Sequence, residues 1–290
     1  MRWIPTFAVL ALIAAACSPT VQSQPPTTTQ PAATTTTSQA SSEICLSGDL
    51  PFNNDGLVAA LGENAGDATS LTQVRWDPSS NCERVTIVFG TASGAPASTL
   101  GPSGVSVIPF AGIIRVVLPP EVDASAIADT LIEGSLVESV YVVRDTEGIM
   151  FVDIQGVDEV PLTARAFTTT SPATLIIDIV RSDGPAVPIG VTSTQSVTIV
   201  SPTPGPSPYP IVVDGYVEPG LLAVHIRLTV DDAAVVDRSV TVGGWTDTWQ
   251  SLSTVIDDGP TGTAVLFVGT LDTNDQPLEG ARVSITLEQP

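Results

Sequence analysis

The residues of this chain that are best suited to chemistry are a single histidine and several adjacent pairs of acids. His225 alternates with Val224 and Ile226, so we expect it on the solvent side of a strand. With one histidine and no free thiol expected, neither a Ser-His-Asp nor a Cys-His arrangement can be assembled. The sequence also lacks the histidine and free cysteine side chains that a zinc site with nitrogen and sulfur ligands needs. We therefore expect no catalytic residues.

The acidic groups suggest two other kinds of site. Two carboxylates perform glycoside hydrolysis, but Asp158-Glu159, Asp231-Asp232 and Asp257-Asp258 are more typical of solvated turns in so acidic a chain. The loop Asp272-Thr273-Asn274-Asp275 offers oxygens at alternate positions, as calcium sites do, but lacks the glycine and the distal glutamate of an EF-hand. We expect a hairpin turn there, no metal site and no cofactor.

The charge balance argues against several partners. The chain carries 31 acidic and 10 basic residues, a formal net charge of −21, and every basic residue is an arginine. A protein this acidic is unsuited to nucleic acid, or to anionic lipid as a bulk electrostatic partner. We expect any anion to be bound only locally.

The first seventeen residues have the composition of an export signal. Arg2 precedes the apolar run 7–16, which ends in small residues directly before Cys17. Such a run is too short to span a bilayer as a permanent helix and is typical of a secretory signal. We therefore expect the mature protein to be exported.

The triplet Ala14-Ala15-Ala16 followed by Cys17 resembles a bacterial lipobox, although Ala14 stands where that family prefers leucine, valine or isoleucine. The resemblance implies cleavage before Cys17 and a lipid on its thiol, which would anchor the protein to the outer side of the cell membrane. Acylation also removes an unpaired thiol from an oxidising compartment. The alternative is an ordinary signal peptide cut near Ala16, which leaves Cys17 as a spare thiol.

The other two cysteines, Cys45 and Cys82, are expected to form a disulfide, because exported cysteines pair. The alternative is a redox-active pair, but the chain has no Cys-x-x-Cys motif. Before them, residues 18–42 contain only Thr, Ser, Pro, Gln, Ala and one Val. That composition predicts a disordered tether, either a plain solvated spacer or an O-glycosylated stalk.

From Leu71 onward the pattern is that of short β-strands separated by turns, among them a hairpin turn at 144–148. Two short helices are predicted as well, near 57–61 and over 124–132. We assign residues 43–185 to this first domain. Its strands are predicted over 71–76, 84–89, 105–110, 113–118, 136–143, 149–154, 162–168 and 174–180.

Residues 70–183 of this domain contain the segments Val74-Arg75-Trp76, Arg84-Val85-Thr86-Ile87-Val88-Phe89 and Pro172-Ala173-Thr174-Leu175-Ile176-Ile177-Asp178-Ile179. With these segments the domain resembles the AMIN-like domain of exported actinobacterial proteins. The resemblance implies a β-sandwich or barrel-like module associated with the cell wall, and not an enzyme. Trp76 beside Arg75 could form a stacking and hydrogen-bonding platform for a sugar or peptide; packing of Trp76 in the core is the alternative. Arg84, on the next predicted strand, is a further candidate binding residue.

A linker is predicted at 186–194, where proline and glycine interrupt any periodicity. Residues 195–290 then form a second predicted domain with seven short strands, the number of an immunoglobulin-like sandwich. These strands are predicted over 196–200, 211–217, 222–230, 235–242, 252–256, 264–271 and 282–287.

The second domain contains the segments Val200-Ser201-Pro202-Thr203-Pro204-Gly205, Pro210-Ile211-Val212-Val213-Asp214-Gly215-Tyr216-Val217 and Val224-His225-Ile226-Arg227-Leu228. With these segments it resembles the bacterial immunoglobulin-like domain first described beside spore-germination proteins. The resemblance implies a β-sandwich. Residues 195–290 contain no cysteine, so no disulfide can link the two sheets of this domain.

The sequence thus predicts an all-β protein with two β-sandwich or barrel-like domains in tandem behind a disordered tether. We expect a non-catalytic, exported lipoprotein, anchored to the membrane by Cys17, whose domains bind peptidoglycan or an envelope protein. The alternative is a purely structural accessory subunit of a membrane complex, with no ligand of its own.

Overall fold

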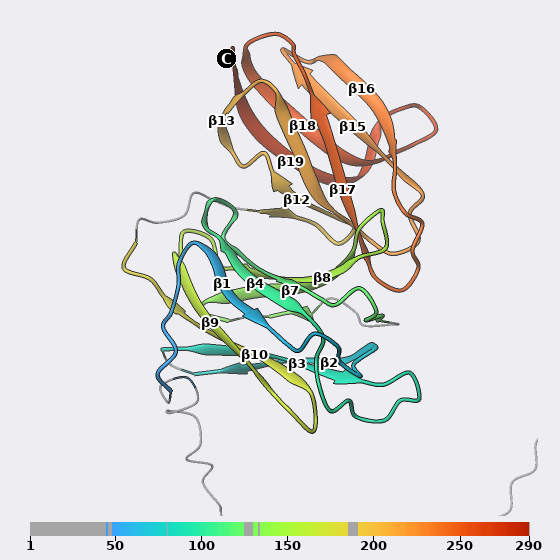
Figure 1. Cartoon of the computed structure of the whole chain (residues 1–290). Helices are drawn as coiled ribbons and strands as arrows, with labels where there is room; N and C mark the ends of the chain where they lie inside the picture. Colours follow the sequence, from blue (N-terminus) through green and yellow to red (C-terminus); the bar gives the residue numbers. More distant parts are fainter. Residues whose placement is uncertain are drawn as a thin grey trace, which may run out of the picture. The chain divides into compact units, whose positions relative to one another are not determined.

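The computed structural model describes residues 45, 48–79, 81–124, 130–132, 134–184 and 191–289, all of which belong to one compact unit, Gln39–Pro290. This part of the chain is all-β, as predicted, and its open sheets build tandem sandwiches (Figure 1). The predicted signal sequence, Cys17 and the tether lie outside the described residues. In the described part, no helix is long and apolar enough to cross a membrane.

The first sandwich packs a four-stranded sheet against one half of a ten-stranded sheet. The four-stranded sheet has the order β2 (Ser70–Pro78), β3 (Glu83–Gly90), β10 (Thr174–Arg181) and β9 (Leu162–Thr169). The facing half contains, in order, β1 (Gly56–Leu61), β4 (Ser103–Ile108), β5 (Ile113–Val117), β8 (Met150–Gly156) and β7 (Val137–Arg144), with β6 (Thr130–Leu131) paired to β7.

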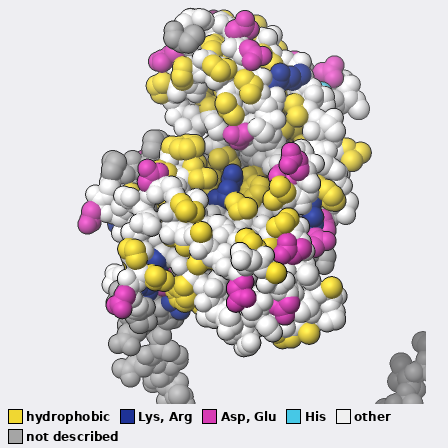
Figure 2. Space-filling view, in the orientation of Figure 1, with side chains coloured by type: hydrophobic (Ala, Val, Ile, Leu, Met, Phe, Trp, Pro, Cys, Tyr) yellow, Lys and Arg dark blue, Asp and Glu magenta, His cyan; other side chains and the backbone are white. Residues whose placement is uncertain are grey.

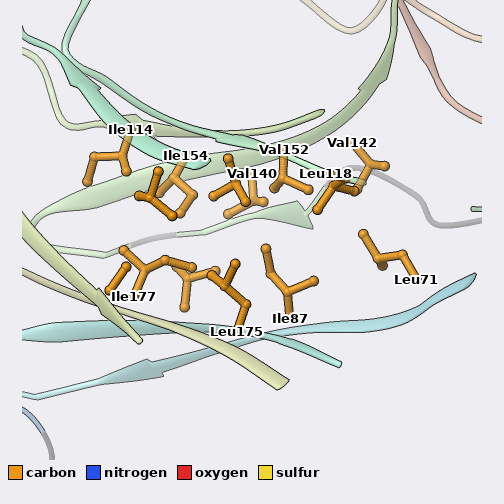
Figure 3. Packing of buried hydrophobic residues seen from close by; sticks show 14 of the residues in the cluster. Leu71, Ile87, Ile114, Leu118, Val140, Val142, Val152, Ile154, Leu175 and Ile177 are labelled. Atoms are coloured by element: carbon orange, nitrogen blue, oxygen red, sulfur yellow. The ribbon is translucent and has the colours of Figure 1, made fainter. Parts of the chain in front are cut away.

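Apolar side chains from the two facing sheets fill the first core. In Figure 3, Val152 and Ile154 of β8 point toward Leu175 and Ile177 of β10. All four are completely buried, and full burial of such a side chain contributes roughly 1.5–3 kcal/mol. The alternation of inward Val85, Ile87 and Phe89 along β3 explains why this run forms a strand of the sandwich.

The second sandwich uses the other half of the ten-stranded sheet and has its own apolar core. This half contains β17 (Trp249–Ile256), β14 (Ile211–Val217), β12 (Val197–Ser201) and β11 (Thr192–Ser193). The facing five-stranded sheet has the order β13 (Gly205–Pro208), β19 (Pro277–Glu288), β18 (Gly262–Leu271), β15 (Ala223–Val230) and β16 (Ala233–Thr241).

The ten-stranded sheet is continuous because β7 and β17 pair in parallel, Val143 opposite Trp249 and Arg144 opposite Gln250. Strands β7 and β8 are buried on both faces, because each strand contributes side chains to two apolar clusters. One face lines the first core. The opposite, outer face contributes to a third apolar cluster, which contains Ala111, Ile113, Tyr141, Val143, Phe151, Val191, Val200, Tyr216 and Trp249.

Local predictions for two loops and for the histidine agree with the structure. The turn before β8 closes with an Asp145 N–H to Ile149 carbonyl bond of 2.9 Å, and the one before β19 with an Asp272 N–H to Gln276 carbonyl bond of 2.8 Å. His225 is half-exposed on β15, on the face opposite Val224.

Other local predictions are wrong. The segment predicted as a helix near 57–61 forms β1 and pairs with β4, because it is short, lies between Gly56 and Gly62, and completes the edge of a sheet. The proline-containing β13 was not predicted; it pairs with β19 at a sheet edge, where a missing backbone donor is tolerated. Of the helix predicted over 124–132, residues 130–131 form β6 and 125–129 lie outside the described residues.

Candidate functional site

Arg75 and Trp76 point to opposite faces of β2. Arg75 lies opposite Thr86 and is exposed, whereas Trp76 lies opposite the buried Val85 and packs against the first core. The indole Nε1 of Trp76 donates a hydrogen bond of 2.9 Å to Oε2 of the buried Glu83. Because successive strand residues alternate faces, the predicted stacking platform does not form.

Arg84 belongs to a buried ion-pair cluster. Its Nε and Nη2 donate to Oδ1 and Oδ2 of Asp178 at 2.6 and 3.0 Å, and Nε and Nη2 of Arg165 donate to Oδ2 at 3.0 and 2.9 Å. Arg165 Nη2 also donates to the Cys45 carbonyl at 2.7 Å. The predicted Cys45–Cys82 disulfide is present beside this cluster. The cluster therefore fastens the start of the described chain to the four-stranded sheet.

Cys45, Cys82 and Asp178 are the one group of metal-ligand side chains that converges in the described part of the chain. Both sulfur atoms are used by the disulfide, and two arginines hold the carboxylate. These three residues therefore offer no ligand set for a metal ion.

The strongest candidate for a functional site is a groove of about 680 Å³ on the outer face of the ten-stranded sheet, where its two halves meet. We call it the junction groove. Hydrophobic side chains gather around a basic side chain between the positions of β8 and β12 in the space-filling view (Figure 2). The groove is lined by Ile108, Phe110, Arg115, Val117, Asp145, Ile149, Phe151, Val200, Ser201, Val212, Asp214, Gly215, Tyr216, Ser251, Leu252 and Ser253.

Four large hydrophobic side chains of the groove are unusually exposed: Phe110 at 66 %, Val117 at 45 %, Ile149 at 38 % and Val212 at 43 %. Phe110 is held on the short 3-10 turn Pro109–Ala111, which ends at Gly112 with a φ of +63°, a conformation that favours glycine. A gathering of exposed apolar side chains is typical of an interaction site.

Beside the apolar wall lies a cluster of Arg115, Asp153 and Tyr216. Arg115 donates from Nε and Nη2 to Oδ1 and Oδ2 of Asp153 at 2.9 and 2.7 Å, and from Nη2 to the Tyr216 hydroxyl at 3.2 Å. The Tyr216 hydroxyl donates to Oδ2 of Asp153. The guanidinium also lies over the Phe151 ring, 4.4 Å from its centroid. This cluster joins β5, β8 and β14, and so holds the two halves of the groove together.

Both partners of Asp153 have shifted pKa values. Burial alone would lower the pKa of Arg115, but the hydrogen bond and charge of Asp153 outweigh it, so the pKa is raised and the guanidinium stays charged. Burial, reinforced by the Asp153 charge, raises the pKa of Tyr216 well above its usual value. Tyr216 therefore stays protonated as a donor to the carboxylate.

The raised pKa of Tyr216 predicts a loss of stability at alkaline pH. An unfolded tyrosine ionises above about pH 10, while folded Tyr216 resists ionisation, so the unfolded state is favoured as pH rises beyond that value. We expect the free energy of unfolding of Tyr216→Phe to fall less steeply with rising pH than that of the wild type. Urea unfolding measured from neutral to alkaline pH tests this. Parallel curves for Tyr216→Phe and the wild type would contradict the assignment.

The arrangement supports binding through apolar contact and hydrogen bonding. The residues known to line the groove include neither histidine nor cysteine, and its arginine is already paired with a carboxylate. Sequence reasoning missed the groove, although one signal was present: β7 and β8 carry large side chains on both faces, among them Tyr141 and Phe151, which indicates a second buried face.

Comparison with protein-family models and with curated proteins finds no match for this chain.

Proposed function

We propose that this chain is an exported, non-catalytic lipoprotein, anchored by Cys17 on the outer side of the cell membrane, that binds peptidoglycan or an envelope protein. The signal-like start, the lipobox resemblance and the tether support its location. The two domain resemblances support a role at the cell wall.

One observation carries the binding function. The junction groove exposes Phe110, Val117, Ile149 and Val212 together on the outer face of one sheet. Burying these side chains against a partner would be favourable by about 25 cal/mol for each Å² of apolar surface removed from water.

The proposal predicts that the full-length chain, in its own membrane, retains a specific component of the envelope. The test is affinity capture after crosslinking of intact envelope, with and without digestion of the glycan. Loss of the captured component on digestion would identify peptidoglycan, and its persistence would identify a protein. Capture of neither would contradict the binding function.

A further inference from the structure

We infer that the junction groove binds a polypeptide segment that carries apolar side chains together with lysine or arginine. This inference rests on the proposed binding function and names the ligand class of the same site. It follows from the shape of the groove, its exposed apolar wall and the charges that remain unpaired within it.

The size and lining of the groove fit a short segment of chain. Its volume of about 680 Å³ lies within the roughly 300–1,000 Å³ of small-ligand pockets, which is room for several side chains and not for a folded domain. Phe110 and Val117 stand on one side, and Val212 on β14 on the other. Ser251 and Ser253 of β17 add hydroxyl groups that can bond to a peptide backbone.

The charges of the groove favour a basic ligand. Asp153 neutralises Arg115 through two hydrogen bonds, so this arginine is not a free anion receptor. Asp145 and Asp214 also line the groove. The Oδ1 atom of Asp145 accepts the N–H groups of Glu147 and Ile149 at 2.9 and 2.8 Å, which fixes that carboxylate at the rim. A lysine or arginine beside the apolar side chains of the ligand would complement these two carboxylates.

The same charges disfavour two other occupants of an apolar groove. An anionic phospholipid would bring its phosphate toward Asp145 and Asp214, and the described residues that line the groove include no unpaired arginine to receive it. A second copy of the chain would bring another net charge of −21 against the first. A basic, apolar polypeptide meets neither repulsion.

The test uses the full-length chain in detergent micelles and fluorescent peptides of alternating leucine and lysine, leucine and glutamate, or serine and lysine. We expect the leucine–lysine peptide to bind at least about tenfold more tightly than either of the others. Phe110→Ser should weaken this binding about tenfold, while Leu278→Ser, a 70 % exposed residue outside the groove, should not change it. Asp214→Lys should shift the preference toward the leucine–glutamate peptide.

Several results would overturn the inference. These are equal affinity for the lysine and glutamate peptides, equal effects of Phe110→Ser and Leu278→Ser, binding of the chain to anionic phospholipid vesicles that Phe110→Ser weakens, or self-association that blocks the groove. Circular dichroism of each variant shows that the fold is retained. If envelope capture succeeds while the peptide tests fail, the ligand class is wrong and the proposed function stands; failure of envelope capture removes the proposed function itself.

Discussion

Replacement of Asp178 by alanine is expected to lower the free energy of unfolding by about 3–5 kcal/mol, the usual effect of removing one partner from a buried ion pair. Asp178 is completely buried and accepts hydrogen bonds from both Arg84 and Arg165. Arg165 is itself buried, so the substitution removes a carboxylate that its guanidinium pairs with in a site of low solvent access. Urea denaturation of the wild type and the variant measures the difference.

Asp237→Ala provides the matched control. Asp237 pairs with Arg227 at 2.6 Å, but its carboxylate is solvent-accessible, so we expect a loss of at most about 1 kcal/mol. A similar small loss for Asp178→Ala would contradict the structural role of the buried cluster. Asp178→Asn, which keeps the shape and removes the charge, separates the loss of charge from the loss of packing.

Asp153→Ala is expected to lower the free energy of unfolding by about 2–3 kcal/mol and to weaken ligand binding in the junction groove. The buried carboxylate holds both Arg115 and the Tyr216 hydroxyl. The loss is smaller than for Asp178 because Arg115 is about one-third exposed and regains some hydration. Urea unfolding measures the change in the free energy of unfolding, and peptide titration of the same sample measures the change in affinity.

Asp257→Ala, which removes an exposed carboxylate, is the control for overall charge. It should change neither the free energy of unfolding nor the peptide affinity measurably. If Asp153→Ala behaved like Asp257→Ala, the Arg115–Asp153–Tyr216 cluster would not be what holds the groove together. If it lost stability and kept full affinity for the ligand, the cluster would stabilise the fold without shaping the binding site.

Strands, and the direction of their side chains, could be predicted from sequence wherever a strand has one face toward a sandwich core and the other toward solvent. The alternation around His225 placed the histidine correctly, because Val224 and Ile226 had to face the core. The helix predicted near 57–61 was wrong because pairing with β4 overrides the weak local preference of five residues.

The candidate site could not be predicted in the same way, because it depends on contacts between residues far apart in the chain. The groove depends on the pairing of β7 with β17, which joins Val143 to Trp249, far later in the chain. Arg75, Trp76 and Arg84 are close in sequence or lie on adjacent strands, which predicted a shared binding site. In the structure, Arg75 and Trp76 point to opposite faces of β2, and Arg84 forms an ion pair with Asp178. Phe110 gave no local signal of its role, since an isolated exposed aromatic residue is ordinary in a surface turn.

The central claim is that the junction groove holds the partner of this chain in the cell envelope. Its most direct test is envelope capture, after glycan digestion, by the full-length wild type, Phe110→Ser and Leu278→Ser. We predict that the wild type and Leu278→Ser retain the same envelope protein and that Phe110→Ser loses most of it. Equal retention by all three chains would contradict the claim.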